Sequence, residues 1–291
     1  MNQIVEMKKL APSINLLRLE VPEITRKAEA GQFVVLRINE EGERIPMSIT
    51  DLDPQEGILT IIFQEVGKST HHLATFKKGD VLADVVGPLG IPTHIENFGT
   101  ALCIGGGIGI APVHFIAKAL KQKGNKIISI IGARSKDLLI LEDEMKRLSG
   151  KLLISTDDGS YGHHGFVTDL LTDLLSDQTK SGKPSGINFI MAIGPVVMMR
   201  AVCKITQLYQ IKTMVSLNPI MVDATGMCGA CRVTVEGKTK FACVDGPDFD
   251  GHKVDFNELV KRQGMYLKQE KIAMERFDQK MGSHTTKEEV K

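Results

Sequence analysis

The chain of 291 residues is long enough for two domains, since one domain usually spans about 100–200 residues. Hydrophobic residues make up 42% and charged residues 24%, which excludes wholesale disorder. The net charge of +1 and the absence of Trp argue against a nucleic-acid-binding protein. No apolar run approaches the ~20 residues of a membrane span, and the N-terminus lacks the pattern of a signal peptide. We therefore expect a cytoplasmic protein that does not contact a membrane.

The first third of the chain predicts a small β-barrel. Short segments rich in Val, Ile and Leu alternate with turn-forming residues, as expected of a closed antiparallel sheet. The predicted strands are IVEMKKL, INLLRLEV, QFVVLRI, ILTIIFQ and VLADVVG. One short helix, over 69–76, interrupts them.

The middle third changes its period and predicts a parallel α/β sheet. Buried-type strands alternate with helical patterns, which is typical of such sheets. Strands are expected at 101–104, 126–131, 151–155 and 187–193, and helices at 113–121, 142–148 and 167–175. The polar stretch 176–186 is expected to form a surface loop.

The last third is shorter and of different composition. Residues 219–251 are dense in Gly, Asp and Cys and include a hairpin-like piece over 231–243. Residues 255–277 have helical character. The charged tail, 284–291, is expected to be frayed. The expected fold class is two-domain β plus α/β with a small C-terminal module. The expected units are a barrel (1–97), a nucleotide-binding α/β domain (98–218), a metal module (219–251), and a helix and tail (252–291).

The most specific motif is Asp-x4-Cys-x2-Cys-x11-Cys, formed by Asp223, Cys228, Cys231 and Cys243. A plant-type iron–sulfur site has the spacing Cys-x4-Cys-x2-Cys with a distant fourth cysteine. Here Asp223 stands in the place of the first cysteine, and an ionised carboxylate is also able to ligate iron. The motif therefore indicates a two-iron cluster.

Zinc is the other reading of this motif, because three cysteines and an acid also suit Zn²⁺. On that reading the chain is a zinc-stabilised nucleotide-binding regulator without turnover. The remaining cysteines, Cys103 and Cys203, lie in apolar patterns and are expected to be inert core thiols.

A second motif, GGGIGIAPV, joins a buried-type strand to a helix at residues 105–113. Glycines in such a turn let a pyrophosphate approach backbone amides at a helix N-terminus. The match to GxGxxG is imperfect, since Ile110 occupies the third glycine position, and tight strand–helix packing is an alternative explanation. The position of the turn between a strand and a helix favours the nucleotide site. The turn at Gly194 and Pro195 follows a later strand and is expected at the same edge of the sheet, whereas the paired histidines 71–72 and 163–164 are expected to be solvated.

The order of these motifs resembles the ferredoxin–NADP reductase superfamily. The motifs are RIPMS, GKST, GPLG, GGGIGIAPV, GPVVMM and the cysteine segment. The chain is most similar to the branch with the electron-transfer subunit of dihydroorotate dehydrogenase and the small subunits of electron-bifurcating, NADH-dependent ferredoxin:NADP oxidoreductases. The resemblance covers nearly the whole chain, up to about residue 277, and its cysteine segment includes Asp223 as a cluster ligand.

The resemblance implies FAD in the barrel, NAD(H) in the α/β domain and a [2Fe-2S] cluster. The implied FAD contacts are Arg44, Pro46, Met47, Ser48, Gly67, Lys68, Ser69 and Thr70. The implied dinucleotide contacts are Gly107, Gly109, Ala111, Pro112, Gly194 and Pro195. Met47 departs from the superfamily, which often has an aromatic residue there. No catalytic acid or base is expected, because the cofactors carry the chemistry.

The resemblance also implies a heteromeric oxidoreductase. The expected partner is a larger flavoprotein with its own FAD and [4Fe-4S] clusters, similar to the glutamate synthase small subunit, through which ferredoxin takes part indirectly. Partners of the dihydroorotate or sulfide dehydrogenase type remain alternatives. The preference between NAD and NADP stays open, because no acid lies at the usual distance for a ribose contact and Arg134 suits a 2′-phosphate.

Overall fold

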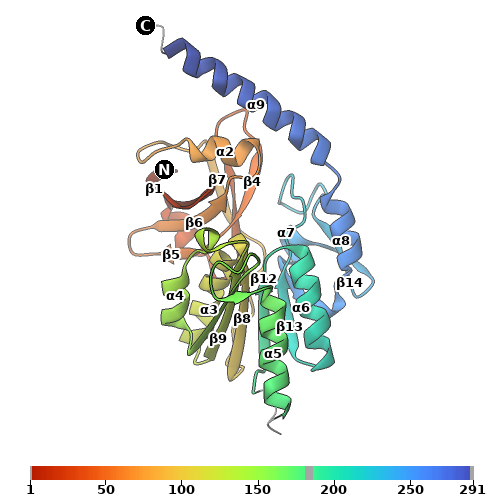
Figure 1. Ribbon diagram of the computed structural model, residues 1–291. Coiled ribbons are helices and arrows are strands. Elements are labelled where there is room, and N and C mark those ends of the chain that lie inside the picture. Colours follow the sequence, from red (N-terminus) through yellow and green to blue (C-terminus); the bar gives the residue numbers. More distant parts are fainter. Residues whose placement is uncertain (1, 181–185, 289–291) are drawn as a thin grey trace.

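The structure, a computed structural model, describes residues 2–180 and 186–288. Figure 1 shows three parts: an N-terminal β region, a parallel sheet with helices on both faces, and a C-terminal segment that packs against that sheet and ends in a long helix. The predicted order of a β region followed by an α/β region is confirmed.

The N-terminal region consists of two antiparallel sheets around one apolar core. The first sheet has the order β1-β2-β6-β5 and the second β4-β3-β7. Alternating side chains such as Leu17 and Leu19 point into the core and are fully buried. The strands are β1 (Gln3–Ala11), β2 (Ile14–Glu20), β3 (Phe33–Arg37), β4 (Arg44–Ser48), β5 (Asp51–Asp53), β6 (Ile58–Gln64) and β7 (Asp84–Leu89), and the helices are α1 (Pro22–Thr25) and α2 (Lys68–Ala74).

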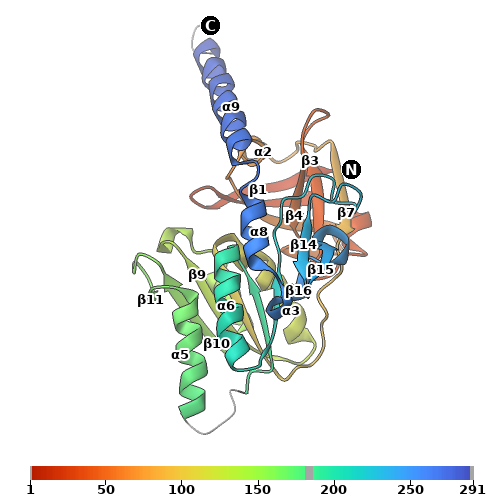
Figure 2. The ribbon, with the colours of Figure 1, turned by 90° about the vertical axis from the view of Figure 1, so that its right-hand side faces the viewer.

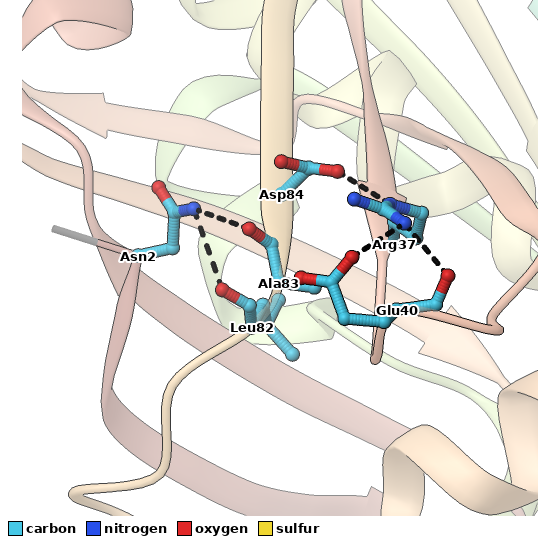
Figure 3. Close-up of polar contacts among 6 residues, drawn as sticks. All are labelled: Asn2, Arg37, Glu40, Leu82, Ala83 and Asp84. Carbon is cyan, nitrogen blue, oxygen red and sulfur yellow. Dashed lines mark hydrogen bonds and ion pairs between the residues drawn. The ribbon is translucent and has the colours of Figure 1, made fainter.

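Polar contacts connect the two sheets at the start of the chain. Asn2 donates to the carbonyl groups of Leu82 and Ala83, both at 3.4 Å, just before β7 (Figure 3). Across β3 and β7, Arg37 pairs with Asp84 and also donates to the Glu40 carbonyl at 2.8 Å. The ends of β1, β3 and β7 are thereby held together.

The central sheet has seven strands in the order β11-β10-β9-β8-β12-β13-β16. All neighbouring pairs are parallel except β13 with β16. The strands are β8 (Thr100–Gly106), β9 (Lys126–Ala133), β10 (Lys151–Thr156), β11 (His163–His164), β12 (Phe189–Ile193), β13 (Lys212–Ser216) and β16 (Asp248–Asp250).

Helices cover both faces of this sheet, which explains why its central strands β8 and β12 are almost entirely apolar. One core contains side chains of α3 and α4, and the other contains those of α5 and α6. Figure 2 shows α5 and α6 next to each other. The helices are α3 (Ile110–Gln122), α4 (Glu142–Leu148), α5 (Val167–Lys180) and α6 (Val196–Leu208), with short 3-10 turns η1 (Gly107–Gly109) and η2 (Lys136–Leu138).

The C-terminal part is a hairpin and three helices joined to the sheet through β16. Its elements are β14 (Arg232–Val235), β15 (Lys238–Phe241), α7 (Ala242–Asp245), η3 (Gly251–Lys253), α8 (Phe256–Gln263) and α9 (Leu267–Glu288). Helix α9 runs past the β region and ends away from it (Figure 1), and Phe277 contacts His72 of α2 with ring centroids 6.2 Å apart. Within the described ranges, no helix combines the length and apolar character that crossing a bilayer requires.

Several sequence predictions differ from the structure. The loop expected over 176–186 is helical as far as Lys180, where α5 ends, and residues 181–185 lie outside the described residues. The helix expected over 255–277 is two helices, because Gly264 ends α8. The tail expected to be frayed from 284 continues α9 to Glu288, and residues 289–291 lie outside the described residues. Residues 44–48, where no strand was expected, form β4.

Candidate functional site

Two glycine turns meet where the strand order of the central sheet reverses. The chain leaves β8 toward β9 on one side and later returns as β12 on the other side of β8. Gly106 is the last residue of β8 and Gly107 begins the turn after it, while the turn after β12 contains Gly194. Ligands of open α/β sheets bind at such a reversal, beyond the carboxyl ends of the strands. The structure therefore brings the two predicted dinucleotide turns to one crevice.

Each glycine of the first turn has a separate reason to be there. A Cβ at Gly106 would lie 2.4 Å from the Met198 sulfur, and one at Gly109 would lie 2.3 Å from the Ile193 carbonyl oxygen. These two glycines allow the two turns to approach each other closely. Gly107 instead has φ +55° and open space around the Cβ position, so it is the glycine that leaves room for a ligand.

The remaining predicted dinucleotide contacts divide between core and surface. Ala111 is fully buried, and Pro112 lies in the first turn of α3, where its missing N–H costs nothing. Gly194 packs against Met198, whereas Pro195 is exposed and precedes the first residue of α6. Of the predicted dinucleotide contacts, Gly107 in the first turn and Pro195 in the second are therefore the positions that leave room for a nucleotide.

An acidic loop at the carboxyl end of β10 was missed by the sequence analysis. Asp157 and Asp158 are exposed and follow directly after the buried Thr156. The Ser160 hydroxyl donates to Asp158 at 2.6 Å, and this bond, with the Ser160 amide, lowers the pKa of Asp158. The signal was a pair of acids directly after a buried strand, at the sheet edge where the glycine turns also lie.

Strand β4 presents predicted FAD contacts along a sheet edge. It pairs only with β3 in its sheet, and Pro46 is tolerated there because an edge strand does not need every N–H in the ladder. Arg44 and Ser48 are exposed at its two ends, while Met47 packs against the core of the β region. An exposed edge with Arg44 at one end and Ser48 at the other suits an extended ligand.

The predicted phosphate loop opens α2 beside the start of β4. Thr70 accepts from the amides of Val66 at 2.9 Å and Gly67 at 3.1 Å, so its hydroxyl caps the helix. Gly67 occupies the N-cap position, and Thr70 is the third residue of the helix, from which its hydroxyl reaches back to the Gly67 amide. Ser69 donates to Glu43, which brings this loop next to Arg44.

The four predicted cluster ligands lie in and beside one irregular loop. Between β13 and β14 the chain forms neither helix nor strand, and Ala224, Gly226 and Gly229 have φ values of 64°, 88° and 66°. These left-handed residues curl the backbone, so that amides point inward. The Cys228 thiol faces the amides of Ala230 and Asp223, which lower its pKa because they stabilise the thiolate.

The other two thiols form a buried pair. The Cys231 and Cys243 sulfur atoms lie 3.2 Å apart, and both residues are buried. Burial raises the pKa of Cys243 to about 12, and the Cys231 thiol adds to this effect. Across residues 2–180 and 186–288, no three His, Cys, Asp or Glu side chains gather as ligands of a single metal ion.

The donor set suits a two-iron cluster better than a single zinc ion. Each iron of such a cluster takes two protein ligands, so two pairs are needed rather than one group of four. Cys231 with Cys243 forms one pair. The Cys228 thiol faces the amide of Asp223, so Cys228 and Asp223 form the second pair. A structural zinc ion would require all four donors around one point.

A buried carboxylate lies where the C-terminal part meets the rest of the chain. Asp248 of β16 accepts a 2.5 Å bond from the Thr93 hydroxyl, and its Oδ1 has no partner among the described residues. Burial raises the pKa of Asp248 to about 6. The acid thus prefers its protonated form more strongly than an exposed aspartate does.

The remaining candidates occupy structural positions. Cys103 and Cys203 are buried, and burial raises the pKa of each thiol to about 12. Of the paired histidines, all expected to be solvated, His164 is exposed, whereas His71, His72 and His163 are half-buried, and His163 lies 3.7 Å from Asp169.

Taken together, the fold and the site define a ferredoxin-reductase-like oxidoreductase with a nucleotide crevice and a C-terminal iron–sulfur module. The sequence matches the family described as the oxidoreductase NAD-binding domain over residues 103–204. It also matches the iron–sulfur cluster binding domain of dihydroorotate dehydrogenase B over residues 218–255.

Similar proteins extend this assignment to the whole chain. A Thermotoga maritima homologue of the dihydroorotate dehydrogenase B (NAD+) electron transfer subunit is 48% identical, covering 95% of this chain and 95% of the relative. The electron transfer subunit from Fusobacterium nucleatum is 36% identical, covering 75% of this chain and 83% of the relative. The chain belongs to the family of electron transfer subunits of the dihydroorotate dehydrogenase B type, whose members work in heteromeric oxidoreductases.

Solved structures agree with this fold. A chain of the NADH-dependent reduced ferredoxin-NADP oxidoreductase, studied for flavin-based electron bifurcation, superposes with a TM-score of 0.87 at 48% identity, covering 95% of this chain and 98% of the other. A ferredoxin NADP+ reductase from Neisseria gonorrhoeae shares the fold at 17% identity, with a TM-score of 0.58 and coverage of 74% and 98%.

Proposed function

We propose that this chain is the NAD(H)-, FAD- and [2Fe-2S]-containing subunit of an electron-bifurcating NADH-dependent ferredoxin:NADP oxidoreductase. The observation that carries the proposal is the 48% identity and TM-score of 0.87 with a chain of that enzyme over nearly the full length of both. The cluster loop supports it, since Asp223 stands where the plant-type motif has its first cysteine.

The chain's own residues place the cofactors rather than react. FAD supplies hydride acceptance from NADH, and the cluster supplies one-electron transfer. Gly107 and Pro195 leave room for the dinucleotide at the reversal of the sheet, and Arg44 and Ser48 offer a cation and a hydroxyl along the exposed edge of β4. Asp223 and the three cysteines would hold the cluster.

Placement dominates the mechanism because hydride transfer needs the donor carbon within about 3–3.5 Å of its acceptor. The close approach of Gly106 to Met198 fixes the floor of the crevice. Buried strands β8 and β12 make that floor rigid, since their side chains are almost entirely excluded from water. No side chain of the chain needs to donate or abstract a proton in this step.

The proposed partner is the larger flavoprotein subunit of the same enzyme, with FAD and [4Fe-4S] clusters, through which reduced ferredoxin and NADP(H) act. Alone, the chain would oxidise NADH only with artificial acceptors. The domain boundaries 1–97, 98–218, 219–251 and 252–291 belong to this proposal. They assign FAD, NAD(H) and the cluster to successive parts of the chain.

A second candidate is the electron transfer subunit of a dihydroorotate dehydrogenase. The names of relatives at 32–36% identity favour it. Asp223 favours the first candidate, since the dihydroorotate subunits are expected to have four cysteines. Co-purification of the chain with its large subunit separates the two, because a pyrimidine-oxidising partner and a ferredoxin-linked partner differ in their substrates.

The proposal is tested with the purified chain under anaerobic conditions. We expect bound FAD, about two irons and two sulfides per chain, and bleaching of the flavin absorbance on addition of NADH. A colourless chain with one zinc ion would replace the proposal by a zinc-stabilised regulator. Bound FAD that neither NADH nor NADPH bleaches would contradict the hydride step.

A further inference from the structure

An ion pair joins the β region to the cluster loop. The Arg44 guanidinium at the start of β4 donates from Nη1 to Oδ1 of Asp223 at 2.8 Å, across 179 positions of sequence. The Asp223 side chain is 22% exposed and that of Arg44 is 54% exposed. This contact therefore brings a positive charge directly onto the one predicted cluster ligand that is not a cysteine.

The Asp223 carboxylate is held from its other side as well. Its Oδ2 accepts from the Thr225 hydroxyl, and from the Thr225 amide at 3.2 Å. The intervening Ala224 is in the left-handed region at φ 64°, which turns the chain so that Thr225 faces back to Asp223. Both carboxylate oxygens thus accept hydrogen bonds, one from each side of the group.

The groups that hydrogen-bond Asp223 are expected to affect both the binding and the reduction potential of the cluster. Groups that hydrogen-bond a metal ligand orient it, and their loss typically weakens the site about 10–100-fold. The reduction potential of an iron–sulfur cluster depends on net charge and hydrogen bonding around its ligands. A guanidinium on the ligand stabilises the reduced cluster, which carries one more negative charge, and so raises the potential.

We propose that Arg44 is a positioning residue for the ligand Asp223, and that it raises the reduction potential of the cluster. This inference rests on the proposed function, since it requires a cluster at Asp223. It adds a role for Arg44 that differs from contact with the FAD phosphates. The Thr225 hydroxyl acts on the same carboxylate from the opposite side.

An ordinary surface ion pair of this exposure would contribute little to folding, about 0–1 kcal/mol. The Arg44–Asp223 ion pair is therefore expected to affect the charge around the ligand rather than the stability of the fold. Lysine keeps the charge at position 44 but loses the planar fork, whereas glutamine loses the charge and keeps one donor. The two substitutions therefore separate charge from geometry.

The test is a redox titration of the FAD-loaded, full-length chain, in which dithionite supplies one electron to the cluster and the reduced cluster is followed by electron paramagnetic resonance. We expect the midpoint potential to become more negative in Arg44→Gln, and less so in Arg44→Lys. Thr225→Val, which lies outside the predicted FAD contacts, should shift the potential in the same direction. The matched control is Arg26→Gln, which removes an equal charge from an exposed pair with Glu23 and should leave the potential unchanged.

Iron, sulfide and FAD are quantified for each variant, so that the possible failures differ. A wild-type chain without a cluster would overturn the proposed function, and this inference with it. Variants that keep their cluster and titrate at the wild-type potential would overturn the role of Arg44 alone. Loss of the cluster in Arg44→Gln, with a retained cluster in Arg44→Lys, would support that role. Loss of the cluster in both variants, with a wild-type midpoint potential in Thr225→Val, would overturn it.

Discussion

The nucleotide crevice and the cluster loop are built by opposite means. The crevice lies at the ends of β8 and β12, whose side chains are almost fully buried between helices. The cluster loop, between β13 and β14, has no helix or strand and is shaped by left-handed residues and side-chain hydrogen bonds. Hydrophobic burial therefore forms the first site, whereas backbone conformation and side-chain hydrogen bonds form the second.

The largest effect is expected from Cys231→Ala, which breaks the buried thiol pair with Cys243. The cluster absorbance and the bound iron should be lost completely, while FAD content and flavin bleaching by NADH survive. Visible spectroscopy with iron analysis measures both. Cys103→Ala is the control, since it removes a buried thiol from β8 and should keep the cluster. Loss of flavin in Cys231→Ala would mean that the two sites do not form independently.

The second effect tests the close packing of the crevice. In Gly109→Ala the new Cβ meets the Ile193 carbonyl oxygen at 2.3 Å. We expect the free energy of unfolding to fall by about 3 kcal/mol and NADH binding to be lost. Gly107→Ala meets no atom within 4 Å and is strained only by its φ of +55°, so it should cost about 1 kcal/mol. Denaturant unfolding compares the two, and equal losses would contradict this view of the turn.

A smaller effect concerns Asp248, whose pKa rises from 3.8 to about 6 on burial. The folded chain binds this proton more tightly than the unfolded chain does. The contribution of Asp248 to stability is therefore present below about pH 4 and is lost as the pH rises through about 6. Asp248→Asn, which stays neutral, should be more stable than the wild type at pH 7 by on the order of 1–3 kcal/mol.

Thermal unfolding at pH 4.5 and pH 7 checks this expectation. The gain of Asp248→Asn should shrink at the lower pH, where the wild-type acid is itself protonated. Asp173→Asn, at an exposed position of α5, is the control and should show no such dependence. A gain that is independent of pH would show that the buried charge is not its cause.

The smallest effect concerns the choice of nucleotide. Asp157 and Asp158 lie exposed at the carboxyl end of β10, where they would repel the 2′-phosphate of NADPH, while Arg134 at the end of β9 would attract it. Asp158→Asn should raise kcat/KM for NADPH relative to NADH about tenfold. Steady-state assays with an artificial acceptor measure this ratio, and Arg134→Ala should move it the other way. An unchanged ratio would place the ribose elsewhere.

The sequence alone was sufficient for the parts whose order is repetitive. Apolar runs alternating with helical patterns predicted β8, β9, β10 and β12, because burial on both faces leaves a continuous apolar signature. The spacing of the cysteines predicted the ligand segment because three of the four predicted ligands lie within nine residues of one another in the chain. The iron–sulfur cluster binding domain matched over residues 218–255 includes that segment, whereas the individual ligands remain a prediction.

What the sequence could not reveal depends on contacts between distant residues. Strand β16 is only Asp248–Asp250, whose two acids do not resemble a strand, and it forms because β13 offers an open edge. No strand was expected over residues 44–48, which contain Pro46; the edge position of β4 tolerates this proline. The hydrogen bond between Arg44 and Asp223 joins residues 179 positions apart, so no local sequence pattern predicts it.

The position of β16 has a consequence for engineering. Because this strand comes after the cysteines in the chain and pairs with β13, the metal-binding segment cannot be removed without removing a strand of the central sheet. A truncated chain ending at residue 218 would lose β16 and leave the backbone groups of Val215 and its neighbours unsatisfied along the sheet margin. Unprotected margins of this kind recruit other chains. Shortened versions of the protein should therefore self-associate rather than survive as a stand-alone diaphorase.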